Sequence, residues 1–392
     1  MTEYVFSIPL EPTAFRLPSI APGLDSQFAG VYRHFSEHTR SPTTSFDSAA
    51  SIHFDSLTAL STLESAGAAD MYFNSFTPIW VWLMNQGRYR DAASVWDWAV
   101  RPVLQWEARS GQPLHKGSAF YFAAITALLQ DDLDGGFLLA HAALEEDVRT
   151  HGHLNPQTPS LALAVLDPEP FQQLFRQWVA ARAATLDAWL VAYRDRHGRT
   201  LSLARLRQYY LLAPLNRENA FLLAYCVARL ERLASLPAVA KKGVFASQLH
   251  ANLLFDLVLL LDQAIPCVEA KRPTFIHLAA ELSAKASLGL SRPDLRALND
   301  AFNDDFDSTV VAVLDGVFRL PDGRALTSLA AALAVSYGCR NRGAHSTAAS
   351  PVASTRFDDV LGAVLDCFFL AVESVGIAAP VHPAASGTTS TP

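Results

Sequence analysis

From about residue 71 onward, apolar residues recur three and four positions apart, and no segment alternates between apolar and polar residues. The first spacing places apolar side chains on one face of a helix, whereas strict alternation is typical of a half-buried strand. Runs such as "FQQLFRQWVAARAATLDAWLVAYRDRHG" and "VFASQLHANLLFDLVLLLDQAIPC" are long enough for helices of several turns. The sequence therefore predicts an all-α fold.

The chain has 392 residues, which exceeds what one ordinary hydrophobic core supports, so two or three domains are expected. Half of the residues are hydrophobic, which is ample material for such cores. Clusters of Pro and turn-forming residues mark the boundaries. The predicted parts are an irregular region at 1–70, which includes a short strand at "YVFSIPL", a helical-repeat-like region at 71–165, connecting helices at 166–240, a helical bundle at 241–378 and a disordered tail at 379–392.

The segment "FTPIWVWLMNQGRYRDAASVWDWAVRPVLQWEARSG" reads as two antiparallel helices with Gly87 at the turn. Tyr89, Ala92, Trp96 and Ala99 recur at helical spacing, so they share one face. This pattern resembles a tetratricopeptide-type helix pair, in which a glycine, an aromatic residue and alternating small and large residues let two helices nest. The resemblance implies a surface at which this region senses or binds a protein partner or regulator.

A weaker copy of the pattern follows at residues 119–147, with Leu133, Gly136, Ala140 and Ala143. The spacing is longer than a strict repeat, and Pro102 is expected to interrupt the second helix of the first pair. An ordinary helical bundle explains these features about equally well.

Charged residues make up 18% of the chain, and the formal net charge is −7. A uniformly acidic protein is a poor generic nucleic-acid binder, so any nucleic-acid contact requires a local basic patch. The four cysteines, Cys226, Cys267, Cys339 and Cys367, are far apart and show no metal-binding spacing, so buried free thiols in a reducing cytosol are expected.

The N-terminus lacks the basic start and long apolar stretch of a signal peptide. No run reaches the roughly 18 uninterrupted apolar residues that a membrane span needs, because Asp256 and Asp262 interrupt the most apolar helix. A cytoplasmic protein without membrane contact is therefore expected.

The most distinctive local feature is "AVSYGCRNRGAHSTAAS", in which Arg340, Asn341 and His345 follow a strongly apolar helical run. An Arg followed five positions later by a His also occurs at 33–38 and at 272–277, and roughly one match is expected by chance. The match at 33–38 lies in the irregular region, and Pro273 follows the Arg at 272. Only the third match has an Asn after the Arg and apolar helices on both sides.

An Arg, a following polar residue and a His four to six positions after the Arg, placed near the last helices of a bundle, resemble the signature of the HEPN superfamily. The resemblance covers about residues 241–378. It implies a compact helical bundle, metal-independent endoribonuclease activity and a homodimer in which two motifs form a composite site. It also implies a context of prokaryotic antiphage defence or toxin–antitoxin growth arrest.

The residue types suit RNA cleavage, in which the 2′-hydroxyl attacks the adjacent phosphate and leaves a 2′,3′-cyclic phosphate. His345 can move protons near neutral pH, and Arg340 can hold the phosphate through two parallel hydrogen bonds. The resemblance implies that Asn341 orients the histidine or bonds the phosphate. Arg342 lies outside the family pattern and is a weaker candidate for a phosphate contact. The chemistry needs no metal or cofactor, and neither is expected.

Two alternatives stay open. Arg340 and Arg342 can simply cap a helix C-terminus, with Gly343 as the stop. The bundle can also be a non-catalytic module that binds a nucleotide or RNA, or the whole chain a helical scaffold. No nucleophile elbow, phosphate-binding glycine loop or zinc-protease helix occurs.

Two further local features carry structural predictions. In "SRPDLRALNDAF", Ser291 is a plausible N-cap and Pro293 falls in the first turn. The following "DSTVVAVLDGVF" is expected to continue that helix.

Overall fold

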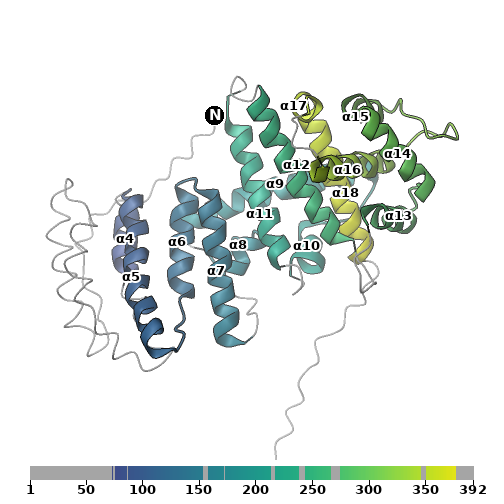
Figure 1. The fold of residues 1–392 in the computed structure, drawn as a ribbon. Helices are drawn as coiled ribbons and strands as arrows, with labels where there is room; N and C mark the ends of the chain where they lie inside the picture. The colour runs from purple at the N-terminus through teal and green to yellow at the C-terminus, as the bar shows by residue number, and fades with distance from the viewer. Residues whose placement is uncertain are drawn as a thin grey trace, which may run out of the picture. The chain divides into compact units, whose positions relative to one another are not determined.

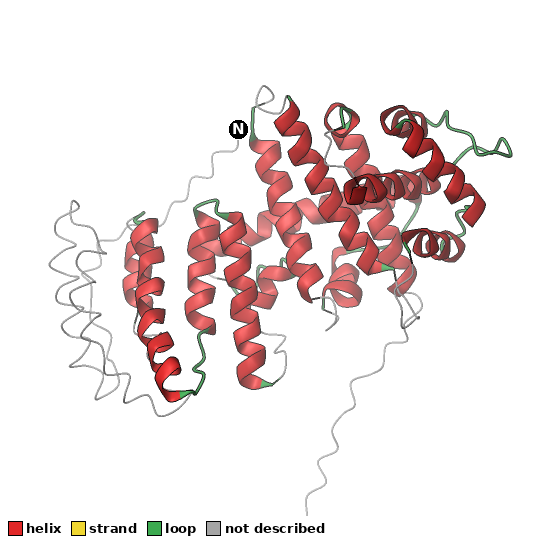
Figure 2. Ribbon diagram, in the orientation of Figure 1, coloured by secondary structure: helices red, strands yellow, loops and turns green. Residues whose placement is uncertain are grey.

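The structure is a computed structural model that describes residues 73, 76–85, 87–152, 158–171, 173–212, 217–237, 243–265, 274–345 and 350–376. Within these ranges the chain is helical, and Figure 2 shows no strand; the closest feature is an isolated bridge between Arg319 and Ala325. The all-α prediction is confirmed. The strand expected at 4–10, the tail at 379–392, the Arg–His match at 33–38 and Cys267 lie outside the described residues.

The chain divides into two compact units, unit 1 (Met1–Ala180) and unit 2 (Ala181–Pro392). The division falls inside the helix α9 (Gln173–His197). The segment 166–240, expected to connect two domains, is therefore shared between the units, and its later helices pack into unit 2. For example, α11 (Arg217–Ser235) packs against α12 (Val244–Ala264) because both carry continuous apolar faces.

Unit 1 consists of consecutive helices, and those before α9 pack against their neighbours in chain order (Figure 1). They are α4 (Thr77–Asn85), α5 (Tyr89–Ser110), α6 (Gly117–Leu129), α7 (Leu133–His151), α8 (Pro159–Ala164) and the first part of α9. Gly87 has a φ of +68°, a conformation that favours glycine, and it lies in the turn between α4 and α5 as expected. Ala92, Trp96 and Ala99 are buried, so the predicted apolar face of α5 is present.

The expected interruption at Pro102 was wrong, because α5 runs without a break from Tyr89 to Ser110. Ala99 and Val103 are fully buried on either side of the proline. The packing of this face offsets the hydrogen bond that a proline removes from a helix. Between α6 and α7, a Cβ at Gly136 would lie only 2.5 Å from the Leu128 side chain, so these two helices approach closely.

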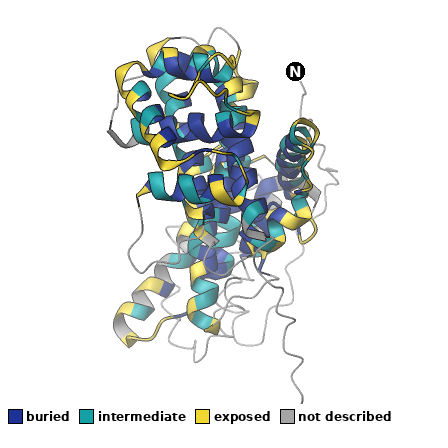
Figure 3. Ribbon diagram, turned by 90° about the vertical axis from the view of Figure 1, so that its right-hand side faces the viewer, coloured by how far each residue is buried: buried dark blue, intermediate teal, exposed yellow. Residues whose placement is uncertain are grey.

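Unit 2 is a bundle around the buried helix α16 (Ser328–His345). The unit also contains the remainder of α9 and the two helices α11 and α12. Its other elements are α10 (Leu203–Leu206), the π-helical turn η2 (Arg207–Leu211), α13 (Phe275–Lys285), α14 (Arg292–Asp304), α15 (Phe306–Leu314), α17 (Val352–Thr355) and α18 (Phe357–Gly376). Helix α16 packs against α12, α13, α14, α15 and α18. Figure 3 shows buried residues in dark blue alternating along the helices with exposed residues in yellow.

Local sequence signals decide the boundary between α14 and α15. The predicted N-cap is confirmed: the Ser291 side chain accepts from the Asp294 backbone N–H, and Asp294 reciprocates as a capping box. The expected continuation of α14 was wrong, because Asp305 is extended at φ −150° and caps the new helix α15 through the Ser308 backbone N–H. An aspartate that accepts from the backbone in this way favours a helix start over a helix interior.

Among the described helices, α12 is long and apolar enough to cross a membrane by length and composition, with a mean hydropathy of 1.6 in its most apolar window. In unit 2, however, it packs against α11, α16 and α18, and Leu253, Leu257 and Leu261 are buried there. Its Asp256 pairs with Arg229 at 3.1 Å. These contacts are those of a core helix, which passes the same length and composition test.

Candidate functional site

The Arg–Asn–His motif lies on the last turns of α16, inside the helix. The alternative in which Gly343 stops the helix is contradicted, since α16 continues through this glycine and ends at His345. Upstream, Leu333, Ser336 and Tyr337 are buried. A helix fixed by packing along most of its length holds the backbone of the motif in place.

Arg340 is held at the edge of the bundle by two neighbours. Its Nη2 atom lies 3.6 Å from Oδ2 of Asp262 on α12, and its guanidinium lies 5.5 Å from the ring centroid of Phe275 on α13. The separation from Asp262 is that of an ion pair but exceeds the length of a good charge-assisted hydrogen bond. The Arg340 side chain is 30% exposed. A positioned, partly exposed guanidinium can still donate to an anion.

Asn341 points to a different neighbour. Its Nδ2 donates to Oδ1 of Asn299 on α14 at 2.8 Å. In this structure the amide therefore links α16 to α14. His345 follows one helical turn later and is the last residue of α16; its side chain lies outside the described atoms.

Arg342 stacks on α15, with its guanidinium 4.6 Å from the ring centroid of Phe306. Its Nε is buried and has no hydrogen-bond partner among the described atoms. A buried N–H without an acceptor is unfavourable, and an acceptor such as a phosphate oxygen would relieve this. Because successive helical residues are about 100° apart, Arg340 and Arg342 leave α16 in different directions and do not form one cluster.

No family model, curated protein or solved structure matches this chain. Within the described ranges, no group of three His, Cys, Asp or Glu residues could hold a metal ion. The HEPN and tetratricopeptide resemblances therefore remain predictions that rest on the residues quoted above.

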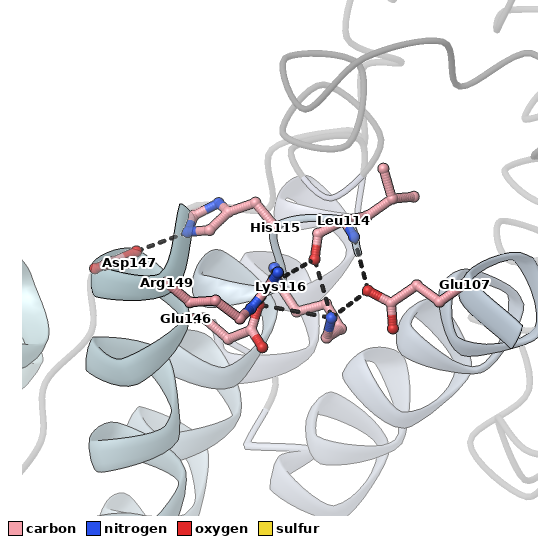
Figure 4. Close-up of polar contacts among 7 residues, drawn as sticks. All are labelled: Glu107, Leu114, His115, Lys116, Glu146, Asp147 and Arg149. Carbon is pink, nitrogen blue, oxygen red and sulfur yellow. Dashed lines mark hydrogen bonds and ion pairs between the residues drawn. The ribbon is translucent and has the colours of Figure 1, made fainter. Parts of the chain in front are cut away.

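A polar cluster that the sequence did not reveal lies in unit 1, between the end of α5, the loop before α6 and the end of α7 (Figure 4). The Lys116 side chain is only 8% exposed. Its Nζ donates to Oε1 of Glu107 at 2.5 Å and to the Leu114 carbonyl at 2.9 Å, and it lies 3.5 Å from Oε2 of Glu146. Two carboxylates thus compensate one buried ammonium group.

Neighbouring contacts extend this cluster along the same loop. Arg149 donates to both Glu146 and the Leu114 carbonyl, and the His115 ring contacts Oδ1 of Asp147 at 2.7 Å. Glu107 also accepts from the Leu114 backbone N–H at 2.7 Å. Side chains from α5 and α7 therefore hold the loop between α5 and α6 in place. We assign this cluster a structural role.

A second unpredicted constellation lies in unit 2, where the end of α9 meets α18 and the start of α16. Asp366 accepts from Arg196 and contacts His197, and the other ring nitrogen of His197 contacts Ser328. These residues are separated by up to 170 positions. No local sequence motif joins them, so spacing alone could not have identified the group.

Proposed function

We propose that the end of α16 is the catalytic motif of a metal-independent endoribonuclease of HEPN type. The observation that carries this proposal is the setting of Arg340, which is half-buried on a packed helix, stacked near Phe275 and paired only loosely with Asp262. Such an arginine is oriented before a ligand arrives and can exchange its 3.6 Å ion pair for close hydrogen bonds to a phosphate.

In the proposed reaction the RNA 2′-oxygen attacks the adjacent phosphorus, and the bond from phosphorus to the 5′-oxygen breaks. One histidine removes the proton from the 2′-hydroxyl, and a second proton donor protonates the departing 5′-oxygen. Arg340 stabilises the negative charge that builds up on the phosphate oxygens. The products are a 2′,3′-cyclic phosphate and a free 5′-hydroxyl.

The helical placement of the motif favours a composite site. Residues five apart on a helix lie about 140° apart around its axis, so Arg340 and His345 of one α16 face different directions. In a homodimer, the arginine of one copy can face the histidine of the other, and the two histidines can serve as base and acid. This is the arrangement that the HEPN resemblance implies.

Asn341 and Arg342 take supporting roles in this proposal. Asn341 positions the end of α16 through its hydrogen bond to Asn299. The buried Nε of Arg342 faces another side of α16 and offers a donor for a separate anion contact. The biological setting would be prokaryotic antiphage defence or growth arrest, with the helices of unit 1 as the surface for a protein partner or regulator.

A second candidate function is a non-catalytic module that binds a nucleotide or RNA. The net charge of −7 favours it over an RNA-processing enzyme, because an acidic surface repels long polyanions. Both candidates use Arg340 as the phosphate contact. They differ in the role of His345, which the ribonuclease needs for proton transfer and the binding module does not need.

The test is incubation of the purified protein with a mixed RNA pool in EDTA, together with the variants Arg340→Ala and His345→Ala. His277→Ala is the matched control, since His277 also follows an arginine by five positions and its ring hydrogen-bonds to Thr274 at the start of its own helix. We expect cleavage with cyclic-phosphate ends by the wild type and by His277→Ala, and none by the other two. Sedimentation velocity on the same samples should show a dimer.

Cleavage that survives in His345→Ala would overturn the catalytic role of the motif. Intact RNA in every sample, combined with a monomeric wild type, would remove the composite-site proposal. If the wild type then binds RNA and Arg340→Ala does not, this result would favour the binding module.

A further inference from the structure

The start of α16 carries a second arrangement of reactive side chains, far from the Arg340 motif. Ser328 is the first residue of α16 and is exposed. It lies twelve positions before Arg340, which corresponds to about 18 Å along a helix. Its Oγ is 3.2 Å from Nδ1 of His197, and Nε2 of the same ring is 2.7 Å from Oδ2 of Asp366.

The three residues differ in exposure in a way that suits a reactive group. The side chains of His197 and Asp366 are 4% and 8% exposed, whereas Ser328 is an exposed residue. The imidazole and the carboxylate are thus shielded from water, and the nucleophile is accessible. We propose that Ser328 is a nucleophile activated by His197, at a site that transfers or hydrolyses the acyl group of carboxylic esters.

The hydrogen bonds fix the protonation pattern that this role needs. Asp366 accepts from Nη2 of Arg196 at 2.6 Å and from its Nε at 3.2 Å, and these two bonds hold the carboxylate with its Oδ2 toward the histidine. A neutral His197 then carries its proton on Nε2 and donates it to Asp366. This leaves Nδ1 as the acceptor for the Ser328 hydroxyl, which is the state a general base requires.

The order hydroxyl, imidazole, carboxylate is that of the known serine-nucleophile triads, with the two ring nitrogens exchanged. Such triads recur on unrelated folds and are recognised by geometry. Here the three members come from α16, α9 and α18, all within unit 2.

Helix α16 also supplies donors for the negative charge that forms on an attacked carbonyl. The Thr327 side chain accepts from the Ala330 N–H at 3.3 Å, and its backbone carbonyl accepts from the Ala331 N–H. Within the described part of the chain, the N–H groups of Ser328 and Leu329 have no partner. The first N–H groups of a helix are left without intrahelical acceptors, and here they adjoin the nucleophile.

The proposed reaction passes through an acyl–serine ester. The Ser328 oxygen attacks the ester carbonyl carbon while its proton passes to Nδ1 of His197. The bond from carbon to the alkoxy oxygen then breaks, and the same proton leaves with the alcohol. Water, activated by His197, hydrolyses the acyl–serine ester and releases the carboxylic acid. Asp366 is a positioning residue, because it acts through the imidazole.

The first experiment treats the full-length protein with a fluorophosphonate probe, which forms a bond from phosphorus to the serine oxygen and releases fluoride. Peptide mass spectrometry should place the adduct on Ser328, and Ser328→Ala should remove it. Ser235→Ala is the matched control: its exposed hydroxyl donates only to the carbonyl of Arg232 in its own turn, so its loss should leave labelling unchanged. Arg340→Ala should also keep the label, which separates this site from the proposed ribonuclease.

A second measurement does not depend on the probe. In Ser328→Cys the imidazole should promote formation of the thiolate, so iodoacetamide should alkylate this cysteine at least tenfold faster than the cysteine of Ser235→Cys. Both substitutions are at exposed positions and should not affect folding. When His197→Gln is added to each variant, the two alkylation rates should become equal. Equal rates in the single variants, or an adduct on other serines but not on Ser328, would show that His197 only joins helices and would overturn the proposal.

Discussion

The buried charge cluster of unit 1 makes a quantitative prediction about stability. In Glu107→Ala, Lys116 loses its closest carboxylate at 2.5 Å, and the Leu114 N–H loses its acceptor. Breaking a buried ion pair by removing one partner destabilises a protein by about 3–5 kcal/mol. Because Glu146 remains 3.5 Å from the ammonium, we expect the lower end of this range, about 3 kcal/mol.

Replacing both partners should be less harmful than removing one. In Glu107→Gln/Lys116→Met the buried ammonium is absent, and the amide oxygen at position 107 still accepts from Leu114. We expect this double variant to lose less stability than Glu107→Ala, by about 1–2 kcal/mol, since well-packed apolar substitutes for buried pairs are often close to neutral. Glu169→Gln is the control, because Glu169 and Arg176 form an exposed pair that contributes about 0–1 kcal/mol.

Urea unfolding followed by tryptophan fluorescence suits this test, because six of the seven tryptophans lie in unit 1. With a slope of about 3 kcal/mol per molar urea, the Glu107→Ala midpoint should fall by about 1 M. A midpoint for Glu107→Ala within about 0.2 M of the control would refute the inference that Glu107 compensates a desolvated charge.

Three further predictions concern unit 2. Ser291→Ala should lower its stability by about 1 kcal/mol in thermal unfolding, because the capping box at the start of α14 is lost; no change would show that Asp294 alone suffices. Gly338→Ala should lower stability by about 1–2 kcal/mol despite the better helix propensity of alanine, because the new Cβ would lie 2.9 Å from the Phe302 ring; a rise in melting temperature would contradict this. Burial raises the pKa of the Cys367 thiol to about 12, so at pH 8 it stays protonated; iodoacetamide should modify it only after unfolding, and rapid native-state modification would contradict its burial.

Much of the fold could be predicted because helical spacing repeats along the chain. The apolar face of Ala92, Trp96 and Ala99 lies where the pattern placed it, and the Ser291 cap follows from a local hydrogen bond. The local error at Pro102 has a physical cause. A proline weakens an isolated helix, but burial of Ala99 and Val103 on either side of it in α5 outweighs that local preference.

The polar sites could be predicted only where their residues lie close together in the sequence. Arg340, Asn341 and His345 are neighbours on one helix, so a motif could reveal them. Lys116 meets Glu146, and His197 meets Asp366, through the packing of distant helices. The sequence shows that such residues exist, but the pairing depends on helix crossings that no local spacing encodes.

The most direct test of the central claim is the ratio of RNA cleavage rates between the wild type and His345→Ala in EDTA. We expect this substitution to reduce the rate by about 10²–10⁴-fold, the contribution expected of a residue that transfers protons. We also expect cyclic-phosphate ends on the wild-type products. Equal rates for the two proteins, or cleavage that stops when EDTA is added, would contradict a metal-independent ribonuclease centred on α16.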